Sequence, residues 1–174
     1  MRKTTLILLG SVLAVLAATG GTGTPGGGGT ASPGFSATIG GVAVDVVLPG
    51  DGWSQGAVSP GNFTISGPSG VTITVTPLSS AVGLGNTDMD SLCKDKLAEK
   101  SGAVTTGTKV VVDKNSAGVT YALRSYTSGG NVYFVGVSGT STCGVMLYAK
   151  VATAQKNTMQ NALKSILGAL ALSK

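Results

Sequence analysis

Apolar residues follow three different patterns along this chain of 174 residues, and each pattern indicates a different kind of segment. Residues 6–16 form a mostly apolar run near the N-terminus, whereas residues 19–34 consist of Gly, Thr, Pro, Ser and Ala alone. From residue 35 onward, alternating and helical patterns follow one another to the end. The length suits one folded domain, which we expect to occupy residues 35–174.

Alternation of apolar and polar residues predicts a series of strands in this domain. Residues 71–76 alternate valine or isoleucine with threonine, so the threonines would form a row on one side of a strand. Threonine rows repeated over many strands can bind ice or carbohydrate, but this single row is interpreted as a solvated face. The predicted strands, about six to seven in one antiparallel sheet, cover residues 42–48, 62–66, 71–76, 108–113, 119–127, 131–138 and 143–151.

Two segments have the apolar spacing of amphipathic helices. In residues 87–100, Thr87 is the expected N-cap, acidic residues lie in the first turn and Gly102 can close the helix. The second helix is predicted over residues 153–170, where an unbroken apolar stripe faces away from a polar side. Such a stripe is typical of a helix that packs on a core.

The order of these elements is strands, one helix, four strands and a final helix, which predicts an α+β fold. Residues 132–137 are apolar at nearly every position, as expected of a strand that is covered on both faces. We therefore expect an α/β/α sandwich, in which two helices cover the two faces of the antiparallel sheet.

The N-terminal pattern is that of a secretory signal peptide over residues 1–18. Arg2 and Lys3 precede the apolar run and small residues follow it, so cleavage is expected between residues 17 and 20. The run is too short for a membrane span, which needs about 20 residues, and no transmembrane segment is expected after cleavage. The protein is therefore predicted to be exported, to the periplasm or the extracellular space, where it could associate with the envelope.

Leu16, Ala17 and Ala18 are similar to the end of a bacterial lipoprotein leader, in which the next residue is a lipid-accepting cysteine. Thr19 stands at that position, and its hydroxyl is a far weaker nucleophile than a thiolate, so lipidation is not expected. Either a lost acceptor or chance would explain the pattern. Residues 19–34 are predicted to form a flexible tether of the kind that lipoproteins often carry.

Composition excludes several kinds of chemistry. The chain has no histidine and two cysteines, so it cannot build a Ser-His-Asp or Cys-His catalytic set or a histidine-ligated metal site. Asp88 and Asp90 have the spacing of a metal-binding pair. Because a third ligand is not evident, they are interpreted as charges at the positive end of a helix. No metal site, cofactor or catalytic residue is predicted.

The net charge of the whole chain is +5, from 12 Lys and Arg against 7 Asp and Glu. Removal of Arg2 and Lys3 with the leader leaves 10 against 7, a net charge of +3. Nucleic-acid-binding domains concentrate many more cations on one face. No nucleic-acid partner is therefore predicted.

Cys93 and Cys143 are predicted to form a structural disulfide. Exported proteins commonly pair their cysteines, and a helix with Cys93 on its inner face must pack on the sheet that carries Cys143. Two buried thiols or a redox pair are the alternatives, although the redox motif Cys-x-x-Cys is absent.

Ser91 and Lys94 match the Ser-x-x-Lys pattern, in which a lysine amine acts as the base for a serine nucleophile. The companion motifs Ser-Asp-Asn and Lys-Thr-Gly of penicillin-binding enzymes are absent. The domain is also too small for that fold. A small Ser-Lys hydrolase is therefore kept only as an alternative function.

Residues 46–53, Val-Val-Leu-Pro-Gly-Asp-Gly-Trp, resemble the opening of PsbP-like extracytoplasmic domains. This family includes photosystem II extrinsic subunits and small bacterial lipoproteins, and many members have a first strand that ends in Leu-Pro before Gly-Trp. The order of elements over residues 43–170 is also similar. The resemblance implies an α/β/α sandwich and a non-enzymatic accessory or binding role in the cell envelope. The metal-associated histidines of some members have no counterpart here.

These patterns together predict an exported, monomeric, non-enzymatic accessory or binding protein of the bacterial cell envelope. Its partner would be an envelope protein or a surface polymer. A purely structural surface component is the alternative beside the hydrolase. The candidate contact residues are four tyrosines and one arginine: Tyr121, Tyr126, Tyr133, Tyr148 and Arg124. Ordinary packing within the sheet explains these side chains equally well, so they are not assigned to a site.

Overall fold

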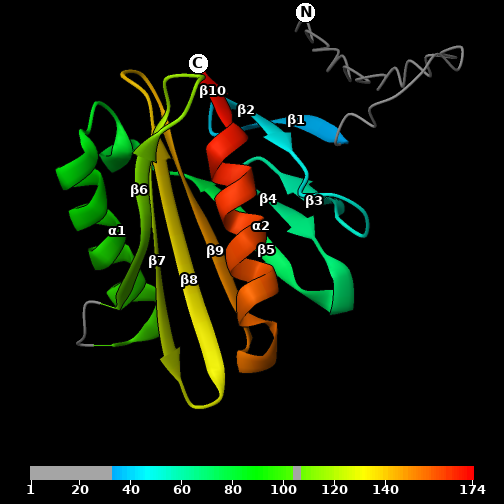
Figure 1. The fold of residues 1–174 in the computed structure, drawn as a ribbon. Helices are drawn as coiled ribbons and strands as arrows, with labels where there is room; N and C mark the ends of the chain where they lie inside the picture. Colours follow the sequence, from blue (N-terminus) through cyan, green and yellow to red (C-terminus); the bar gives the residue numbers. More distant parts are fainter. Residues whose placement is uncertain (1–32, 104–106) are drawn as a thin grey trace, which may run out of the picture. The chain divides into compact units, whose positions relative to one another are not determined.

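The computed structural model describes residues 33–103 and 107–174 (Figure 1). The expected leader and almost all of the expected tether lie outside the described residues. The strands are β1 (Gly34–Ile39), β2 (Val42–Val47), β3 (Ser54–Ser59), β4 (Asn62–Ser66), β5 (Thr72–Pro77), β6 (Thr108–Lys114), β7 (Thr120–Ser128), β8 (Asn131–Gly139), β9 (Gly144–Ala152) and β10 (Ala171–Ser173). The helices are α1 (Asn86–Ser101) and α2 (Lys156–Ala169), with short 3-10 helices η1 (Pro68–Gly70), η2 (Ser79–Ala81) and η3 (Thr153–Gln155).

The strands form two antiparallel sheets. The large sheet has seven strands in the order β3-β4-β5-β9-β8-β7-β6, and the small sheet has three in the order β1-β2-β10. Strands β6 to β9 form a meander, because each pairs with the next along the chain. The small sheet joins the beginning of the described chain to its end, since β10 pairs with β2.

Alternating side chains of β8 divide the interior into two cores, one on each face of the large sheet. Val132 and Phe134 belong to the core that α2 and the small sheet cover, whereas Val135 and Val137 belong to the core under α1. The two helices therefore lie on opposite faces of the large sheet (Figure 1). This confirms the expected α+β fold, with helices on both faces of an antiparallel sheet.

Helix α2 approaches the sheet closely where its apolar stripe meets a glycine. Met159, Leu163 and Leu167 on this stripe are fully buried. A Cβ atom at Gly136 of β8 would lie 2.9 Å from Leu167 Cδ1, so a larger residue would force the helix outward. None of the helices in the described residues has the length and apolar character that crossing a bilayer requires.

Helix α1 begins at Asn86, and its N-cap is Gly85 rather than the expected Thr87. Gly85 has an extended backbone, with φ −79° and ψ 175°, and no side chain caps the helix. Thr87 lies inside the first turn. The predicted end of the helix is confirmed, because Gly102 adopts the left-handed φ of 65° that favours glycine at this position.

Candidate functional site

Asp90 on α1 and Arg124 on β7 form a bidentate ion pair between helix and sheet. Arg124 Nε donates to Asp90 Oδ1 over 2.8 Å, and Arg124 Nη2 donates to Asp90 Oδ2 over 2.9 Å. Lys109 Nζ on β6 lies 3.6 Å from Asp90 Oδ2. The hydrogen bond from Arg124 lowers the pKa of Asp90, although burial acts in the opposite direction. The carboxylate is thus held as a paired anion that links α1 to the sheet.

The ion pair between Asp90 and Arg124 also turns Asp90 away from Asp88, although the spacing of these two carboxylates in the sequence resembles a metal-binding pair. Asp88 is exposed in the first turn of α1, whereas Asp90 is turned toward Arg124. Over residues 33–103 and 107–174, the structure brings no three His, Cys, Asp or Glu side chains together as metal ligands. The Asp88–Asp90 spacing therefore corresponds to one exposed helix charge and one ion-paired group.

Cys93 and Cys143 do not form the expected disulfide, because both are free and buried. Cys93 lies in the core under α1, whereas Cys143 belongs to the core on the opposite face of the sheet. The predicted disulfide requires α1 to cover the face of the sheet that carries Cys143, and apolar periodicity does not show which face a helix covers. Cys93 Sγ lies 3.1 Å from the carbonyl oxygen of Val135. Burial raises the pKa of the Cys93 thiol to about 12, which makes it a poor nucleophile near neutral pH.

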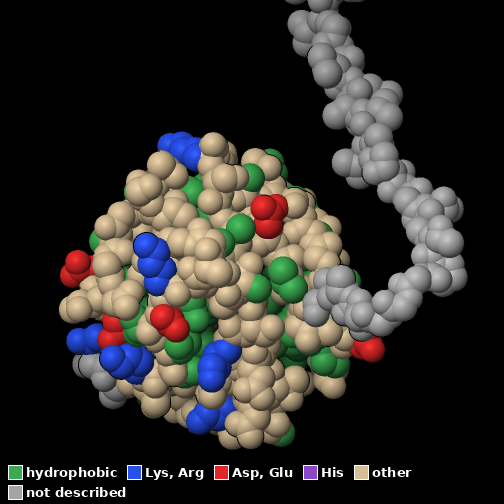
Figure 2. All heavy atoms as spheres, turned by 45° about the horizontal axis from the view of Figure 1, so that its top comes forward, with side chains coloured by type: hydrophobic (Ala, Val, Ile, Leu, Met, Phe, Trp, Pro, Cys, Tyr) green, Lys and Arg blue, Asp and Glu red, His purple; other side chains and the backbone are tan. Residues whose placement is uncertain are grey.

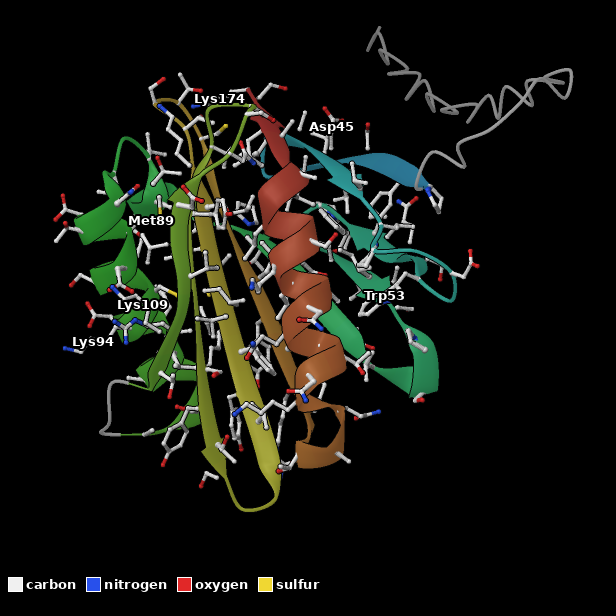
Figure 3. The ribbon with its side chains drawn as sticks, in the orientation of Figure 1. Asp45, Trp53, Met89, Lys94, Lys109 and Lys174 are labelled. Carbon is white, nitrogen blue, oxygen red and sulfur yellow. The ribbon has the colours of Figure 1, made fainter. Side chains whose placement is uncertain are left out.

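Ser91 and Lys94, the candidate nucleophile and base, both lie on the exposed side of α1. Lys94 points away from the sheet (Figure 3). Between these two described side chains the structure shows no hydrogen bond, and both are open to solvent. A serine–lysine mechanism needs the amine close to the hydroxyl and out of water, and this location does not supply that environment.

A cleft of about 170 Å³ opens at one end of the domain, and we call it the apical cleft. Its lining residues include Pro77, Leu78, Ser79, Thr142, Cys143 and Lys174. Figure 2 turns this end of the domain, which carries the C-terminus in Figure 1, toward the viewer and shows charges of both signs scattered among apolar and neutral side chains. Ligand pockets usually measure roughly 300–1,000 Å³, so the apical cleft would hold a single side chain or a group of similar size.

The α1 side of the large sheet carries a second group of polar side chains, which we call the tyrosine face. Helix α1 packs on β6, β7 and β8, while the same side of the sheet continues over β9, β5 and β4. Its side chains are exposed or half-buried. The tyrosine face consists of Thr64, Ser66, Thr72, Thr74, Tyr126, Tyr133, Tyr148 and Lys150.

Strand register places these side chains in two rows across the sheet. In the first row, Thr74 lies opposite Thr64 on one side and Tyr148 on the other. In the second, Tyr133 lies opposite both Tyr126 and Lys150. Directly opposite side chains in antiparallel strands have Cβ atoms about 5 Å apart. The hydroxyl-bearing strands β4 and β5 therefore continue into the tyrosine-bearing strands β9, β8 and β7.

Two lysines lie against the tyrosine rings. Lys150 Nζ is 5.2 Å from the centroid of the Tyr133 ring, and Lys100 Nζ, near the end of α1, is 5.9 Å from that of Tyr148. Burial raises the pKa of Tyr148, so its phenol remains a neutral hydrogen-bond donor. The rings of Tyr133 and Tyr148, with the ammonium groups of Lys150 and Lys100 against them, lie beside the rows of hydroxyl groups.

The sequence pointed to part of this site. Tyr126, Tyr133 and Tyr148 were among the candidate contact residues, and they share the tyrosine face. Tyr121 does not belong with them, because it is buried in the core on the opposite face. Sequence reasoning missed Lys150, although alternation along the last predicted strand places it on the same side as Tyr148.

Comparisons with known proteins find similar solved structures but no matching family. No family model matches the chain, and no curated protein matches its sequence. LpqN of Mycobacterium tuberculosis, described as involved in cell envelope biogenesis, has 14% identity and a TM-score of 0.47, with 82% of this chain and 91% of LpqN covered. A Bacteroides thetaiotaomicron structure has 11% identity and a TM-score of 0.43, covering 75% of this chain and 45% of its own. The chain thus spans less than half of that second protein, and the PsbP-like resemblance is not confirmed.

Proposed function

We propose that this chain is an exported, non-enzymatic accessory or binding protein of the bacterial cell envelope. The support for export is the order of segments in the sequence: two cations, an apolar run, small residues, a glycine-rich tether and then a folded domain. The first described strand, β1, begins at Gly34, where the tether was expected to end. A domain at the end of such a tether could reach a partner on or near the membrane surface.

The observation that carries the binding role is the tyrosine face. Tyrosines are common at binding surfaces because their rings offer apolar area and their hydroxyls offer a hydrogen bond. Here three tyrosines and a row of hydroxyls lie together on one half-exposed sheet surface. In contrast, the partly buried carboxylate of Asp90 is hydrogen-bonded to Arg124, and the Cys93 thiol is held as a neutral group. These features favour recognition over bond-breaking chemistry.

The test of export uses the complete chain expressed in a bacterial host. We expect fractionation to place the mature protein outside the cytoplasm, and mass spectrometry to find its N-terminus after residue 17, 18, 19 or 20 without attached lipid. A cytoplasmic protein that retains Met1 would contradict the proposal.

The test of binding is cosedimentation of the exported protein with isolated, washed envelope fractions. We expect saturable association that a double variant of the tyrosine face, Tyr148→Phe with Lys150→Gln, weakens. Resistance of the bound protein to mild detergent and salt would instead indicate a structural surface component.

A Ser91→Ala variant tests the hydrolase alternative, and loss of a hydrolytic activity in that variant would contradict the non-enzymatic role.

A further inference from the structure

We propose that the tyrosine face binds an anionic glycan, that is, a polysaccharide chain with carboxylate or phosphate groups. This inference rests on the proposed function and names the chemical class of the partner. It arises from three properties that the fold brings together on one surface: rows of hydroxyl groups, half-exposed phenol rings and exposed positive charge.

The hydroxyl rows provide hydrogen bonds in a regular array. Thr74 lies opposite Thr64, and Thr72 lies opposite Ser66, on neighbouring strands about 4.8 Å apart. Ser54 of β3 in turn lies opposite Ser66, so one row continues across a third strand. The Thr64 hydroxyl already donates to the carbonyl oxygen of Ala57 over 3.4 Å and keeps its acceptor capacity, whereas a hydroxyl without such a bond can both donate and accept. A surface of this kind matches the many hydroxyl groups of a sugar chain, which also donate and accept.

The tyrosines provide apolar platforms beside these rows. Tyr133 and Tyr148 are half-buried, with part of each side chain open to solvent. An aromatic ring can pack against the C–H groups of a sugar ring, while its hydroxyl bonds to the sugar hydroxyls. Thr74 and Tyr148 are directly opposite one another. One sugar unit could therefore contact a ring and a threonine hydroxyl at the same time.

The charge of the tyrosine face indicates the charge that its partner should carry. Strands β4, β5, β7, β8 and β9 contain two charged residues, Arg124 and Lys150, and both are cations. Arg124 is bound to Asp90, whereas Lys150 is exposed beside Tyr133. Lys100 adds a second ammonium group beside Tyr148. On the neighbouring surface of α1, Glu99 forms an ion pair with Lys96 at 2.7 Å and also feels the charge of Lys100, so two lysines stand against this one carboxylate. The complementary partner carries negative charge.

Two other classes of macromolecule fit this surface less well. A nucleic acid would need a denser array of cations than these two lysines. A protein interface commonly combines aromatic anchors with exposed aliphatic side chains; the tyrosine face supplies the first, but the exposed large apolar residues of the described chain are Val47 and Val58. Val47 is in the small sheet, and Val58 lies opposite Phe63, which faces the other core.

The experiment measures binding of the purified mature protein to defined polymers by affinity electrophoresis. Polygalacturonate supplies a carboxylate glycan and phosphomannan a phosphate glycan. Dextran supplies a neutral glycan and polyglutamate an anionic chain without sugar. We expect binding to one or both anionic glycans, with dissociation constants at least about tenfold lower than for dextran and polyglutamate.

Variants then locate the binding. Lys100→Gln with Lys150→Gln should weaken glycan binding about tenfold, since each exposed cation contributes a modest amount. Thr72→Ala with Thr74→Ala should also weaken it. The matched control is Lys164→Gln, which removes an exposed cation on α2 and should leave binding unchanged. Circular dichroism checks that each variant is folded, and because Lys100, Lys150 and Thr72 are exposed, their replacements should not disturb the core.

Three results would overturn the glycan inference: no binding to either anionic glycan, equal binding of polyglutamate, or equal loss in the Lys164 control. The proposed function fails separately, when the wild-type protein does not associate with envelope fractions at all. If the wild-type protein and the tyrosine-face variants associate with the envelope equally, the accessory role stands and the glycan site is wrong.

Discussion

The guanidinium of Arg124 and the carboxylate of Asp90 meet through two parallel hydrogen bonds of 2.8 and 2.9 Å between β7 and α1. The two side chains are 12% and 18% exposed, so the pair is largely shielded from solvent. Breaking a shielded pair leaves one charge without its partner, which costs far more than losing a surface ion pair. This contact therefore fixes the position of α1 on the sheet as well as adding stability.

Asp90→Asn is expected to lower the free energy of unfolding by about 3 kcal/mol at pH 7, because the charge of Asp90 no longer compensates that of Arg124 at this partly buried position. The effect should depend on pH. Arg124 lowers the pKa of Asp90 below its ordinary value, so the ionised pair stabilises the fold above about pH 4. This contribution is lost as the pH falls through the lowered pKa. Urea unfolding from pH 7 to 2 should show the two proteins converging in acid, and a constant difference would contradict the assignment.

Both cysteines are free and buried, so titration of the denatured, unreduced protein with a thiol reagent should find two thiols per chain. In the native state, the two should react at different rates. Cys93 lies behind α1 with its pKa raised to about 12, whereas Cys143 borders the apical cleft. We expect the Cys93→Ala variant, which retains Cys143, to be labelled faster than Cys143→Ala. Equal labelling rates would show that both thiols react only after global unfolding.

The Asn115 side chain makes four hydrogen bonds, of which two connect the turn before β7 to the end of α2 and two lie within the turn. Its Nδ2 donates to the carbonyl oxygens of Leu167 and Leu170 over 3.1 and 2.9 Å, and its Oδ1 accepts from Ala117 N and Val119 N. Asn115→Ala should lower the free energy of unfolding by about 2–3 kcal/mol, since several polar groups lose their partners.

A matched variant distinguishes the donor role of the Asn115 Nδ2 group from the acceptor role of its Oδ1 atom. Asn115→Asp keeps the acceptor but cannot donate to the helix carbonyls when ionised, and its charge faces the negative end of α2. It should be less stable at pH 7 than at pH 3 relative to wild type. Asn157→Ala, an exposed position on α2, is the control and should change stability by less than about 0.5 kcal/mol. Thermal unfolding at the two pH values measures the difference.

Gly139→Ala should destabilise the domain by about 3 kcal/mol or more, because an added Cβ would overlap the backbone carbonyl oxygen of Ala81 in η2. Neither backbone segment can move without separating η2 from the end of β8. Gly61→Ala is the control, since a Cβ there meets no atom within 4 Å. Chemical unfolding of both variants checks this, and similar stabilities would mean that η2 is free to shift.

Periodicity predicted most elements in which apolar residues alternate or recur over several turns, but β1 was missed although Phe35, Ala37 and Ile39 alternate with polar residues. The alternation in β5 correctly separated Ile73 and Val75 from the threonines, and the stripe of α2 was correctly predicted to be buried. Strand β3 was missed because Val58 is its one large apolar residue and its register shifts at a bulge. Strand β10 has three residues, too few for a pattern.

The arrangement of faces could not be predicted from periodicity. An apolar stripe on α1 shows that Cys93 points inward, but the side of the sheet that receives the helix depends on how the connections cross. The same limit applied to the tyrosine face. The threonines of β5 form one row in the sequence, and only the pairing with β4 and β9 places Thr64 and Tyr148 beside Thr74.

The pairing of Ala171 with Asp45 has a consequence for biosynthesis. Strand β2 emerges early from the ribosome, yet its partner β10 is made after every other described strand. The small sheet is thus incomplete throughout translation, and the core beneath it stays open until residues 171–173 are available. Such a long-range pairing slows folding, and a chain that stays unfolded for longer would be compatible with the export proposed above.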